Sequence, residues 1–382
     1  MRALFLVPWP SDAASTRLRA EQYFPYLREQ GVEPVLRPFM SPALYRMVYK
    51  RGHFGRKIGH VLRGSLGRLA DVIGSRRADV VLVHREALPF GTTIVERAIA
   101  ALGTPMVLDF DDAIYLPTSS EPNGFMRHLK APSKVQGLLR ASQAAIVGNR
   151  HLQRYALPFN ARTLVIPTPV DTSVYYPRAE RRTGDEIVIG WIGSGTTSHY
   201  LRLVAGPLVR LLERHPNVRL EVVGGASGEL ARLGLKGPNV RERQWSRSGE
   251  LHILRGFDIG LMPYPDDEWA RGKCAFKALL YMSVGIPAVC SAVGMAEEIV
   301  DHGQTGFLAR SEDEWYAALE TLVSNQRTRA RVGAAGRDLV ASEFSLERWA
   351  PCFFELLQSV ASGRHVPIDE LDTHAARLVP PA

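Results

Sequence analysis

The sequence predicts an α/β protein with two domains, each built on a doubly wound parallel sheet. Short apolar runs alternate along the chain with amphipathic segments of helix length, as in parallel strands joined by helical crossovers. At 382 residues the chain is too long for one compact core and suits two domains of ordinary size. Its hydrophobic content of 46% and charged content of 23% exclude wholesale disorder.

The N-terminal half contains enough strands for one sheet. Each candidate is a short apolar run that ends at polar or turn-forming residues. In order, the candidates are Ala3 to Val7, Glu33 to Arg37, Val80 to His84, Met106 to Phe110, Ala144 to Val147 and Thr163 to Ile166. We therefore expect a Rossmann-like N-terminal domain over residues 1–170.

A proline-rich stretch separates the two halves. Residues 167–177 lack hydrophobic periodicity and are followed by the charged residues 178–186, a pattern typical of an ordered linker. A second series of strand candidates then begins, and we expect a second Rossmann-like domain over residues 171–345. These candidates are Ile187 to Ile192, Leu220 to Val223, Val240 to Arg243, Ile259 to Met262, Ala288 to Cys290 and Gly306 to Leu308.

The end of the chain is predicted to be a helix and a tail. Residues 346–362 are apolar at helical spacing despite Pro351. A helix of this bulk needs a neighbour to cover it, so we expect it to pack back on the N-terminal domain. Residues 363–382 contain several prolines and little periodicity, and we expect an irregular tail.

Composition excludes several classes of protein. No apolar run approaches the roughly 20 residues of a membrane-spanning helix, and the first ten residues do not form an export signal. The cysteines Cys274, Cys290 and Cys352 are odd in number and lack metal-type spacing, which argues against a disulfide framework and a zinc site. A cytoplasmic location fits best, with a peripheral position at the inner face of the membrane left open.

The net charge is concentrated in one segment. Residues 41–77 contain nine Lys or Arg against one acid, Asp71, so this segment alone accounts for the whole net charge of +8. Such localisation argues against a general nucleic-acid-binding protein. Residues 46–77 also predict an amphipathic helix, and we expect its apolar stripe to face the core; contact with an anionic membrane, an anionic substrate or solvent remains the alternative. The stripe comprises Ile58, Val61, Leu62, Leu66, Leu69 and Val72.

A small-residue loop follows the first strand of the second domain. Open α/β sheets bind ligands at the carboxyl ends of their strands, where loops and helix N-termini converge with unpaired N–H groups. In residues 190–198, Gly193, Ser194 and Gly195 would let backbone amides approach a phosphate. The G-x-G-x-x-G spacing of a dinucleotide site is incomplete, and an ordinary tight turn is the alternative.

Two lysines stand at another strand end. Residues 269–287 predict a loop that opens a helix ending at Gly285. The i, i+4 spacing of Lys273 and Lys277 predicts two ammonium groups on one helix face, beside the positive end of the helix dipole. That arrangement suits a diphosphate, and a solvated lysine pair is the alternative.

These segments together carry a family resemblance. Residues 272–289 read GKCAFKALLYMSVGIPAV, and with residues 293–300 and 303–308 they resemble the donor-binding signature of family 4 of the retaining GT-B glycosyltransferases, in its Gly-Lys-x-x-x-Lys branch. The N-terminal segments Ser15 to Arg19, Asp109 to Asp112 and Ile166 to Asp171 are also similar to members of that family.

The resemblance implies a GT-B fold, in which two Rossmann-like domains face each other across a cleft. The C-terminal domain would hold a nucleoside diphosphate-sugar donor. The N-terminal domain would hold a hydroxyl-bearing acceptor, which is a glycan, a lipid-linked molecule or a small natural product. Anomeric configuration would be retained, with the donor diphosphate helping to deprotonate the acceptor hydroxyl. Neither a metal nor a cofactor is implied.

The chain departs from the family pattern at the donor site. Many members carry two glutamates separated by seven residues where this chain has Gly272 and Leu280, and the second glutamate normally contacts the ribose. Members also commonly carry an arginine where this chain has Ser194. We expect Lys273 and Lys277 to supply the missing positive charge.

The resemblance also assigns individual residues. Asp111 matches a position often occupied by a histidine near the reacting sugar, so it joins Lys273 and Lys277 as a catalytic candidate. An acidic helix cap or turn is the alternative for Asp111 and for Asp112. Glu298 matches a recurrent glutamate that would hydrogen-bond sugar hydroxyls, with helix capping as its alternative.

The acceptor candidates lie after strands of the first domain. Arginines after the first strand could hold an anionic acceptor, although an arginine early in a helix is more often simply exposed. A histidine at the end of the third strand is more often structural than catalytic. The acceptor candidates are Arg17, Arg19, His84 and Asp112.

Other functions compete with sugar transfer. A noncatalytic protein that binds a sugar nucleotide or an anionic polymer would explain the missing glutamates and the basic segment. A nonhydrolysing sugar-nucleotide epimerase shares the two-domain arrangement. An NAD dehydrogenase is disfavoured, because residues 8–15 do not form a dinucleotide glycine turn.

Overall fold

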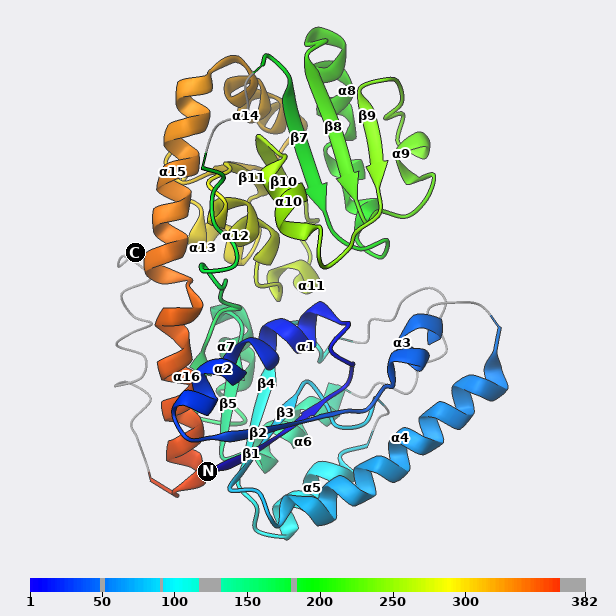
Figure 1. Cartoon of the computed structure of the whole chain (residues 1–382), viewed down its shortest axis with the longest axis vertical. Coiled ribbons are helices and arrows are strands. Elements are labelled where there is room, and N and C mark those ends of the chain that lie inside the picture. Colours follow the sequence, from blue (N-terminus) through cyan, green and yellow to red (C-terminus); the bar gives the residue numbers. More distant parts are fainter. Residues whose placement is uncertain (49–51, 90–91, 117–131, 180–183, 365–382) are drawn as a thin grey trace. The chain divides into compact units, whose positions relative to one another are not determined.

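The computed structural model describes residues 1–48, 52–89, 92–116, 132–179 and 184–364, which form two compact units. The N-terminal unit comprises Met1–Pro169 and the segment from Leu346 onward, and the C-terminal unit comprises Val170–Ser345. Each unit is built on a six-stranded sheet with helices packed against it (Figure 1). The α/β fold class expected from the sequence is confirmed.

The N-terminal sheet is parallel, with the strand order β2-β1-β3-β4-β5-β6. The strands β3, β4 and β5 are buried along their whole length, as expected of apolar runs covered on both faces. All six strand predictions for this half are confirmed to within one residue. The strands are β1 (Arg2–Val7), β2 (Glu33–Pro38), β3 (Val80–His84), β4 (Met106–Phe110), β5 (Ala144–Val147) and β6 (Thr163–Val165).

Helix α16 (Leu346–Ala361) reaches the N-terminal sheet from the far end of the sequence and continues through Pro351. Its buried side shares one hydrophobic core with residues of β1, β3 and β4. The ring of Phe353 stacks on Tyr23, with the centroids 4.1 Å apart. The other helices of this unit are α1 (Ala14–Arg19), η1 (Glu21–Tyr23), α2 (Phe24–Glu29), α3 (Pro42–Val48), α4 (Phe54–Ser75), α5 (Ile94–Ala101), α6 (Pro132–Ala141) and α7 (Arg150–Ala156).

The apolar stripe of the basic segment does not face the core, so that expectation is wrong. The segment forms two helices, of which α4 carries the stripe. Val61 and Val72 are partly buried. The other four stripe residues are 58% to 67% exposed; they are Ile58, Leu62, Leu66 and Leu69.

A buried arginine explains this orientation of α4. The Arg68 guanidinium donates to the backbone carbonyls of Val7 (2.9 Å), Arg37 (2.9 Å) and Ala87 (2.8 Å). It also pairs with Asp71 at 2.8 Å. These carbonyls end the strands β1 and β2 or follow β3, and a buried carbonyl needs a donor. The polar side of α4 therefore faces the sheet and its apolar side faces outward.

The C-terminal sheet is also parallel, with the strand order β12-β11-β10-β7-β8-β9. The predicted strands of this half are confirmed to within two residues. The strands are β7 (Ile187–Ile192), β8 (Val218–Val223), β9 (Val240–Arg243), β10 (Ile259–Met262), β11 (Ala288–Ser291) and β12 (Phe307–Ala309). The helices are η3 (Ser198–Leu203), α8 (Ala205–Arg214), α9 (Glu229–Arg232), α10 (Glu250–Arg255), α11 (Glu268–Arg271), α12 (Phe276–Ser283), α13 (Met295–Ile299), α14 (Glu312–Ser324) and α15 (Gln326–Glu343).

Two glycines let aromatic rings lie directly on this sheet. A Cβ at Gly190 in β7 would stand 2.1 Å from the Phe257 ring, and a Cβ at Gly260 in β10 would stand 2.3 Å from the Tyr281 ring. No side chain larger than hydrogen fits at either position. The Tyr281 hydroxyl in turn accepts from the backbone N–H of Ile192 at 3.1 Å, which fixes the end of β7 where the glycine loop begins.

Among the helices of the described residues, none combines the length and the apolar character required to cross a lipid bilayer.

We predict that Phe353→Ala lowers the free energy of unfolding of the N-terminal unit by about 3 to 5 kcal/mol, because the substitution leaves a cavity under α16. Urea denaturation followed by circular dichroism measures the loss. Gln358→Ala on the exposed side of the same helix is the control and should stay within about 0.5 kcal/mol of the parent protein. Equal stability of the two variants would contradict the packing of α16.

Candidate functional site

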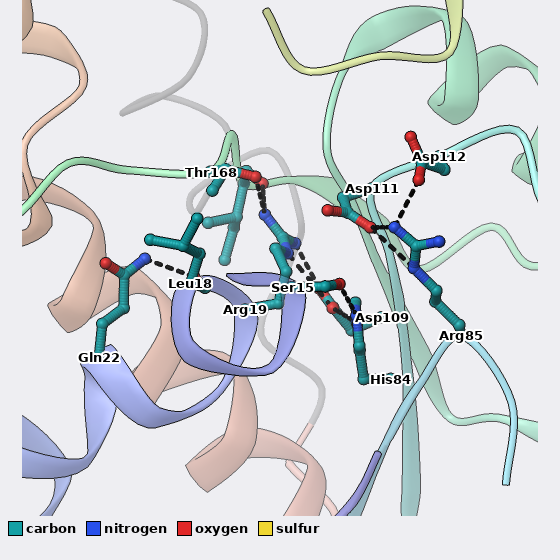
Figure 2. A network of polar contacts seen from close by, with 11 residues as sticks. Ser15, Leu18, Arg19, Gln22, His84, Arg85, Asp109, Asp111, Asp112 and Thr168 are labelled. Carbon is teal, nitrogen blue, oxygen red and sulfur yellow. Dashed lines mark hydrogen bonds and ion pairs between the residues drawn. The ribbon is translucent and has the colours of Figure 1, made fainter. Parts of the chain in front are cut away.

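Polar side chains gather at the carboxyl edge of the N-terminal sheet. β1, β3 and β4 are neighbours in the sheet and run parallel, so the residues at and after their carboxyl ends lie together. Figure 2 shows the resulting network. It contains two clusters of side chains, one centred on Asp109 and one on Arg85.

Asp109 is the centre of the first cluster. Asp109 and His84 are directly paired across β4 and β3, and His84 Nδ1 lies 2.6 Å from Asp109 Oδ2. Arg19 from α1 forms an ion pair with the same carboxylate and donates to the carbonyl oxygen of Ile166 at 2.8 Å. Burial raises the pKa of Asp109, but the Arg19 charge and the His84 hydrogen bond lower that pKa by more, and the net shift is downward. The carboxylate is therefore held ionised.

Ser15 is the end of this network that solvent can reach. An ionised carboxylate only accepts hydrogen bonds, so His84 donates from Nδ1 to Asp109. Ser15 Oγ stands 2.7 Å from the other ring nitrogen of His84, Nε2, within hydrogen-bond distance. Arg19, His84 and Asp109 are at most 1% exposed, whereas Ser15 is partly exposed. The network thus orients one hydroxyl oxygen at the edge of the sheet.

This geometry corrects the expectation for Arg19 and His84. Both were acceptor candidates, but both side chains are hydrogen-bonded inside the unit, Arg19 to Asp109 and the Ile166 carbonyl oxygen and His84 to Asp109. Their role is to position Ser15 and the strand ends. Arg17 is partly exposed and donates from Nη1 to the Asp12 carbonyl oxygen at 3.0 Å, so it holds the loop after β1.

Arg85 is the centre of the second cluster, and the sequence analysis missed it. Its guanidinium donates to Asp111 Oδ1 at 2.7 Å and to Asp112 Oδ2 at 2.5 Å. It also lies over the Trp9 ring, 4.8 Å from the ring centre. The backbone of Arg85 adopts a left-handed φ of 62°, which is uncommon for a residue other than glycine. Its position directly after a strand, beside a candidate histidine, was the signal available in the sequence.

Asp111 and Asp112 share the guanidinium of Arg85. Neither carboxylate caps a helix within the described residues; both pair with one cation. Burial raises the pKa of Asp111, while the charges of Arg85, His84 and Arg19 lower it, and the net shift is downward. Both aspartates remain partly exposed at the sheet edge, so Asp111 is an ionised carboxylate that an incoming hydroxyl can reach.

In the C-terminal unit, the loop after β7 is built for close backbone approach. Gly193 N–H donates to the Val223 carbonyl oxygen at 3.0 Å, and a Cβ at Gly224, whose φ is +76°, would stand 2.2 Å from the Gly193 carbonyl oxygen. The strand ends of β7 and β8 therefore touch through glycine. Ser194 and Gly195 are exposed, and Ser194 Oγ lies 2.7 Å from Thr196 Oγ1.

Lys277 lies against this loop. A Cβ at Gly193 would stand 3.0 Å from Lys277 Cε, and Lys277 Nζ donates to the Tyr264 hydroxyl at 3.1 Å. The ammonium group also lies 5.7 Å from the centre of the Trp191 ring. Lys277 is the second residue of α12, at the positive end of that helix. Lys277 therefore lies beside the glycine loop at the carboxyl edge of the sheet.

Lys273 does not share a helix face with Lys277, and that expectation is wrong. α11 ends at Arg271 and α12 begins at Phe276, so Lys273 lies in the intervening loop. The break occurs because Ala275 adopts a left-handed φ of 47°. Lys273 Nζ lies over the Trp269 ring, 4.6 Å from its centre.

A cavity of about 540 Å³ opens at the carboxyl ends of β8 and β9. The sequence analysis missed it, because its walls come from three separate segments. Trp245 contributes a ring, and its indole N–H donates to Glu250 at 2.5 Å. Two carboxylates, Glu229 and Glu242, also line the cavity. Glu298 is exposed on α13, after β11.

No group of three or more histidines, cysteines or acids in the described part of the chain is arranged to hold a metal ion.

Comparison with known sequences finds a family match within the C-terminal unit. Residues 186–325 match the family model described as "Glycosyl transferases group 1". The chain is 29% identical over 204 residues to a D-inositol 3-phosphate glycosyltransferase from Stackebrandtia nassauensis, which covers 47% of this chain and 45% of that protein. A protein of the same name from Corynebacterium jeikeium is 26% identical over 226 residues, or 53% of this chain and 52% of that protein. The chain spans about half the length of these curated relatives.

Solved structures share the fold of nearly the whole chain. HepE from Anabaena, solved in complex with UDP and glucose, has a TM-score of 0.67 at 16% identity, over 94% of this chain and 100% of that one. Sucrose-phosphate synthase from Thermosynechococcus elongatus has a TM-score of 0.68 at 15% identity, over 95% and 99%. At such identities the likeness is evidence for the fold alone, and the predicted GT-B fold is confirmed. Within that fold, residues 186–325 are similar to the group 1 glycosyl transferase family.

Proposed function

We propose that this chain is a retaining glycosyltransferase that moves a sugar from a nucleoside diphosphate-sugar to an acceptor hydroxyl. The observation that carries the proposal is Lys277, whose side chain lies against the glycine loop at the carboxyl edge of the C-terminal sheet. A diphosphate needs a cation and backbone amides at one place, and this edge has Lys277 beside the exposed loop residues Ser194 and Gly195. The group 1 match over the same residues supports the proposal. Because HepE was solved with UDP, UDP-sugars are the first donors to test.

The nucleoside of the donor is proposed to occupy the cavity beside β8 and β9. At about 540 Å³, the cavity lies within the usual size range of small-molecule sites. The Trp245 ring offers an aromatic wall, and the carboxylates of Glu229 and Glu242 offer acceptors for ribose hydroxyls. Leu280, where relatives carry the ribose-binding glutamate, is only 5% exposed and cannot replace that contact.

The leaving diphosphate is proposed to rest between the Gly193–Gly195 loop and Lys277, with Lys273 and Ser194 as further donors. Negative charge grows on the diphosphate as the bond to the sugar breaks, and fixed cations and N–H groups stabilise that charge. This places lysines where other transferases use a metal, so we propose a metal-independent reaction. Glu298 is proposed to bind hydroxyls of the transferred sugar. Retention follows if the acceptor attacks from the side that the diphosphate leaves, passing its proton to a diphosphate oxygen.

The acceptor is proposed to bind at the carboxyl edge of the N-terminal sheet. Ser15 Oγ and Asp111 are polar groups there that remain partly exposed, and each can hydrogen-bond a hydroxyl. Arg85 offsets much of the Asp111 charge, so Asp111 acts mainly by orienting the acceptor. The acceptor class follows from this chemistry: a hydroxyl-bearing glycan, lipid-linked molecule or small glycoside. A cytoplasmic location is proposed as well, since the three cysteines are free buried thiols.

Replacing Lys277 should weaken donor binding. We predict that Lys277→Ala lowers the affinity for the cognate nucleoside diphosphate by about 1.5 to 3 kcal/mol, because a charge-assisted hydrogen bond is lost. Isothermal titration with a panel of nucleoside diphosphates measures the change. Lys236→Ala removes an exposed lysine from the same unit and should leave affinity unchanged. Unchanged affinity in a Lys273→Ala, Lys277→Ala double variant would refute the diphosphate site.

Replacing Asp111 should affect turnover more than donor binding. In Asp111→Asn the oriented acceptor contact is lost while the donor site is untouched, so we predict a fall in turnover of about tenfold or more, equivalent to about 1.4 kcal/mol in the barrier. Release of nucleoside diphosphate from the donor, with and without acceptor, is the measurement. Asp338→Asn, an exposed site on α15, serves as the control. Turnover at the parent rate in Asp111→Asn would remove Asp111 from the mechanism.

A further inference from the structure

Helix α4 presents a continuous apolar stripe to solvent. The stripe residues follow one another at spacings of three or four, which places them on one face of the helix. They are 58% to 73% exposed, and isolated exposed apolar residues are common but a contiguous row is not. We call this row the α4 stripe: Phe54, Ile58, Leu62, Leu66, Leu69 and Ile73.

The outward direction of the stripe is fixed by the opposite side of the helix. Arg68 holds that side to three backbone carbonyls at the sheet edge, as described above. Gly64 adds to this contact, because a Cβ there would stand 2.8 Å from the Phe39 carbonyl oxygen. Turning the helix to bury the stripe would break the Arg68 hydrogen bonds and take this donor away from the carbonyls of Val7 and Ala87. The stripe is therefore a built surface of the folded unit.

The charge around the stripe selects its occupant. Arg56 and Arg63 are exposed two turns apart on one flank of the helix, and Arg76 and Arg77 are exposed directly after it. The acid of α4, Asp71, is buried and pairs with Arg37 and Arg68. A second copy docking through α4 would set cations against cations. An anionic leaflet accepts the apolar side chains and complements the cations.

We propose that α4 is a membrane-docking helix, which lies in the interface of an anionic leaflet with the α4 stripe inserted between the lipid headgroups. Arg68 connects this surface to the N-terminal site, since it binds the carbonyls of Val7 and Ala87, each two residues from Trp9 or Arg85 of the second cluster. Docking would hold that cluster near the membrane surface. The acceptor would then be lipid-linked, a step that rests on the proposed transferase function.

Vesicle binding tests the docking without any donor or acceptor. The full chain is sedimented with vesicles of phosphatidylcholine alone and of phosphatidylcholine mixed with phosphatidylglycerol. We expect binding to the mixed vesicles at low salt, weaker binding as salt screens the cations, and little binding to phosphatidylcholine alone. Absence of binding to the mixed vesicles at low salt would overturn the proposal.

Three variants separate the stripe from the cations. Leu62→Ser, Leu66→Ser, Leu69→Ser and, separately, Arg56→Gln, Arg63→Gln should each lower the vesicle partition coefficient by about tenfold or more. Lys236→Gln, Arg327→Gln removes the same charge from exposed sites of the C-terminal unit and should lower it much less. Because every substituted side chain is exposed or on the helix flank, thermal unfolding should be unchanged. Equal losses in the two charge variants, with no loss in the serine variant, would reduce the effect to net charge and contradict a docking helix.

Two further readouts complete the test. Light scattering after size exclusion measures self-association. If the parent protein is a dimer that binds no vesicles and the triple serine variant is a monomer, the stripe binds a second copy and the lipid proposal is overturned. Nucleoside diphosphate affinity should be the same in the parent and the stripe variant. Vesicle binding in a protein that binds no nucleotide would keep the docking surface and reject the proposed function.

Discussion

The buried carboxylate of Asp109 is the interaction on which the N-terminal site depends. A lone charge in the interior is costly, and removing one partner of a buried pair leaves the other charge uncompensated at a cost of about 3 to 5 kcal/mol. Here Arg19 and His84 satisfy the carboxylate, and Arg19 also binds the Ile166 carbonyl. One carboxylate thus joins α1, β3, β4 and the chain after β6, and it orients the Ser15 hydroxyl. Because its pKa lies below the ordinary value, this stabilisation is present at neutral pH and is lost as the pH falls through that lowered pKa.

A second buried cation, Arg68, fixes the position of α4 on the sheet, with a different consequence. Arg19 holds a helix whose residues contribute to the site, whereas Arg68 holds a helix whose apolar face is left to solvent. Both arginines bind carbonyls or carboxylates at the carboxyl edge of one sheet. The edge that collects the candidate acceptor groups is therefore the edge to which the docking helix is attached. The hydrogen bonds of these two arginines, more than the apolar pattern of the sequence, determine which side chains are exposed at this edge.

The sequence allowed the strands to be predicted because buried parallel strands appear as short continuous apolar runs with little ambiguity. It also indicated that Lys277 and the Gly193 loop share an edge, since both follow strands of one parallel sheet. It could not predict which side of α4 is buried. Periodicity reveals a stripe, but the partners of Arg68 are backbone carbonyls on three segments that no pattern marks.

The remaining errors have similar local causes. Lys273 and Lys277 have helical spacing, yet a left-handed Ala275 interrupts the helix between them. Arg19 ends α1 and His84 ends β3, but their side chains face a carboxylate that the sequence does not show to point inward. Arg85 and the Trp245 cavity depend on contacts between distant segments. The sequence shows which types of polar residue lie near the strand ends, but it does not show in which direction each side chain points.

The most direct test of this account is a double-mutant cycle between Arg19 and Asp109, measured as the free energy of unfolding at neutral pH. Asp109→Asn should be strongly destabilising, because it leaves Arg19 buried without its carboxylate. Adding Arg19→Met removes that orphaned charge. The loss in the free energy of unfolding of the double variant should therefore be smaller than the sum of the two single losses by about 2 to 3 kcal/mol. If the two losses add to within about 0.5 kcal/mol, the two residues are energetically independent and Asp109 is not the organising charge of the site.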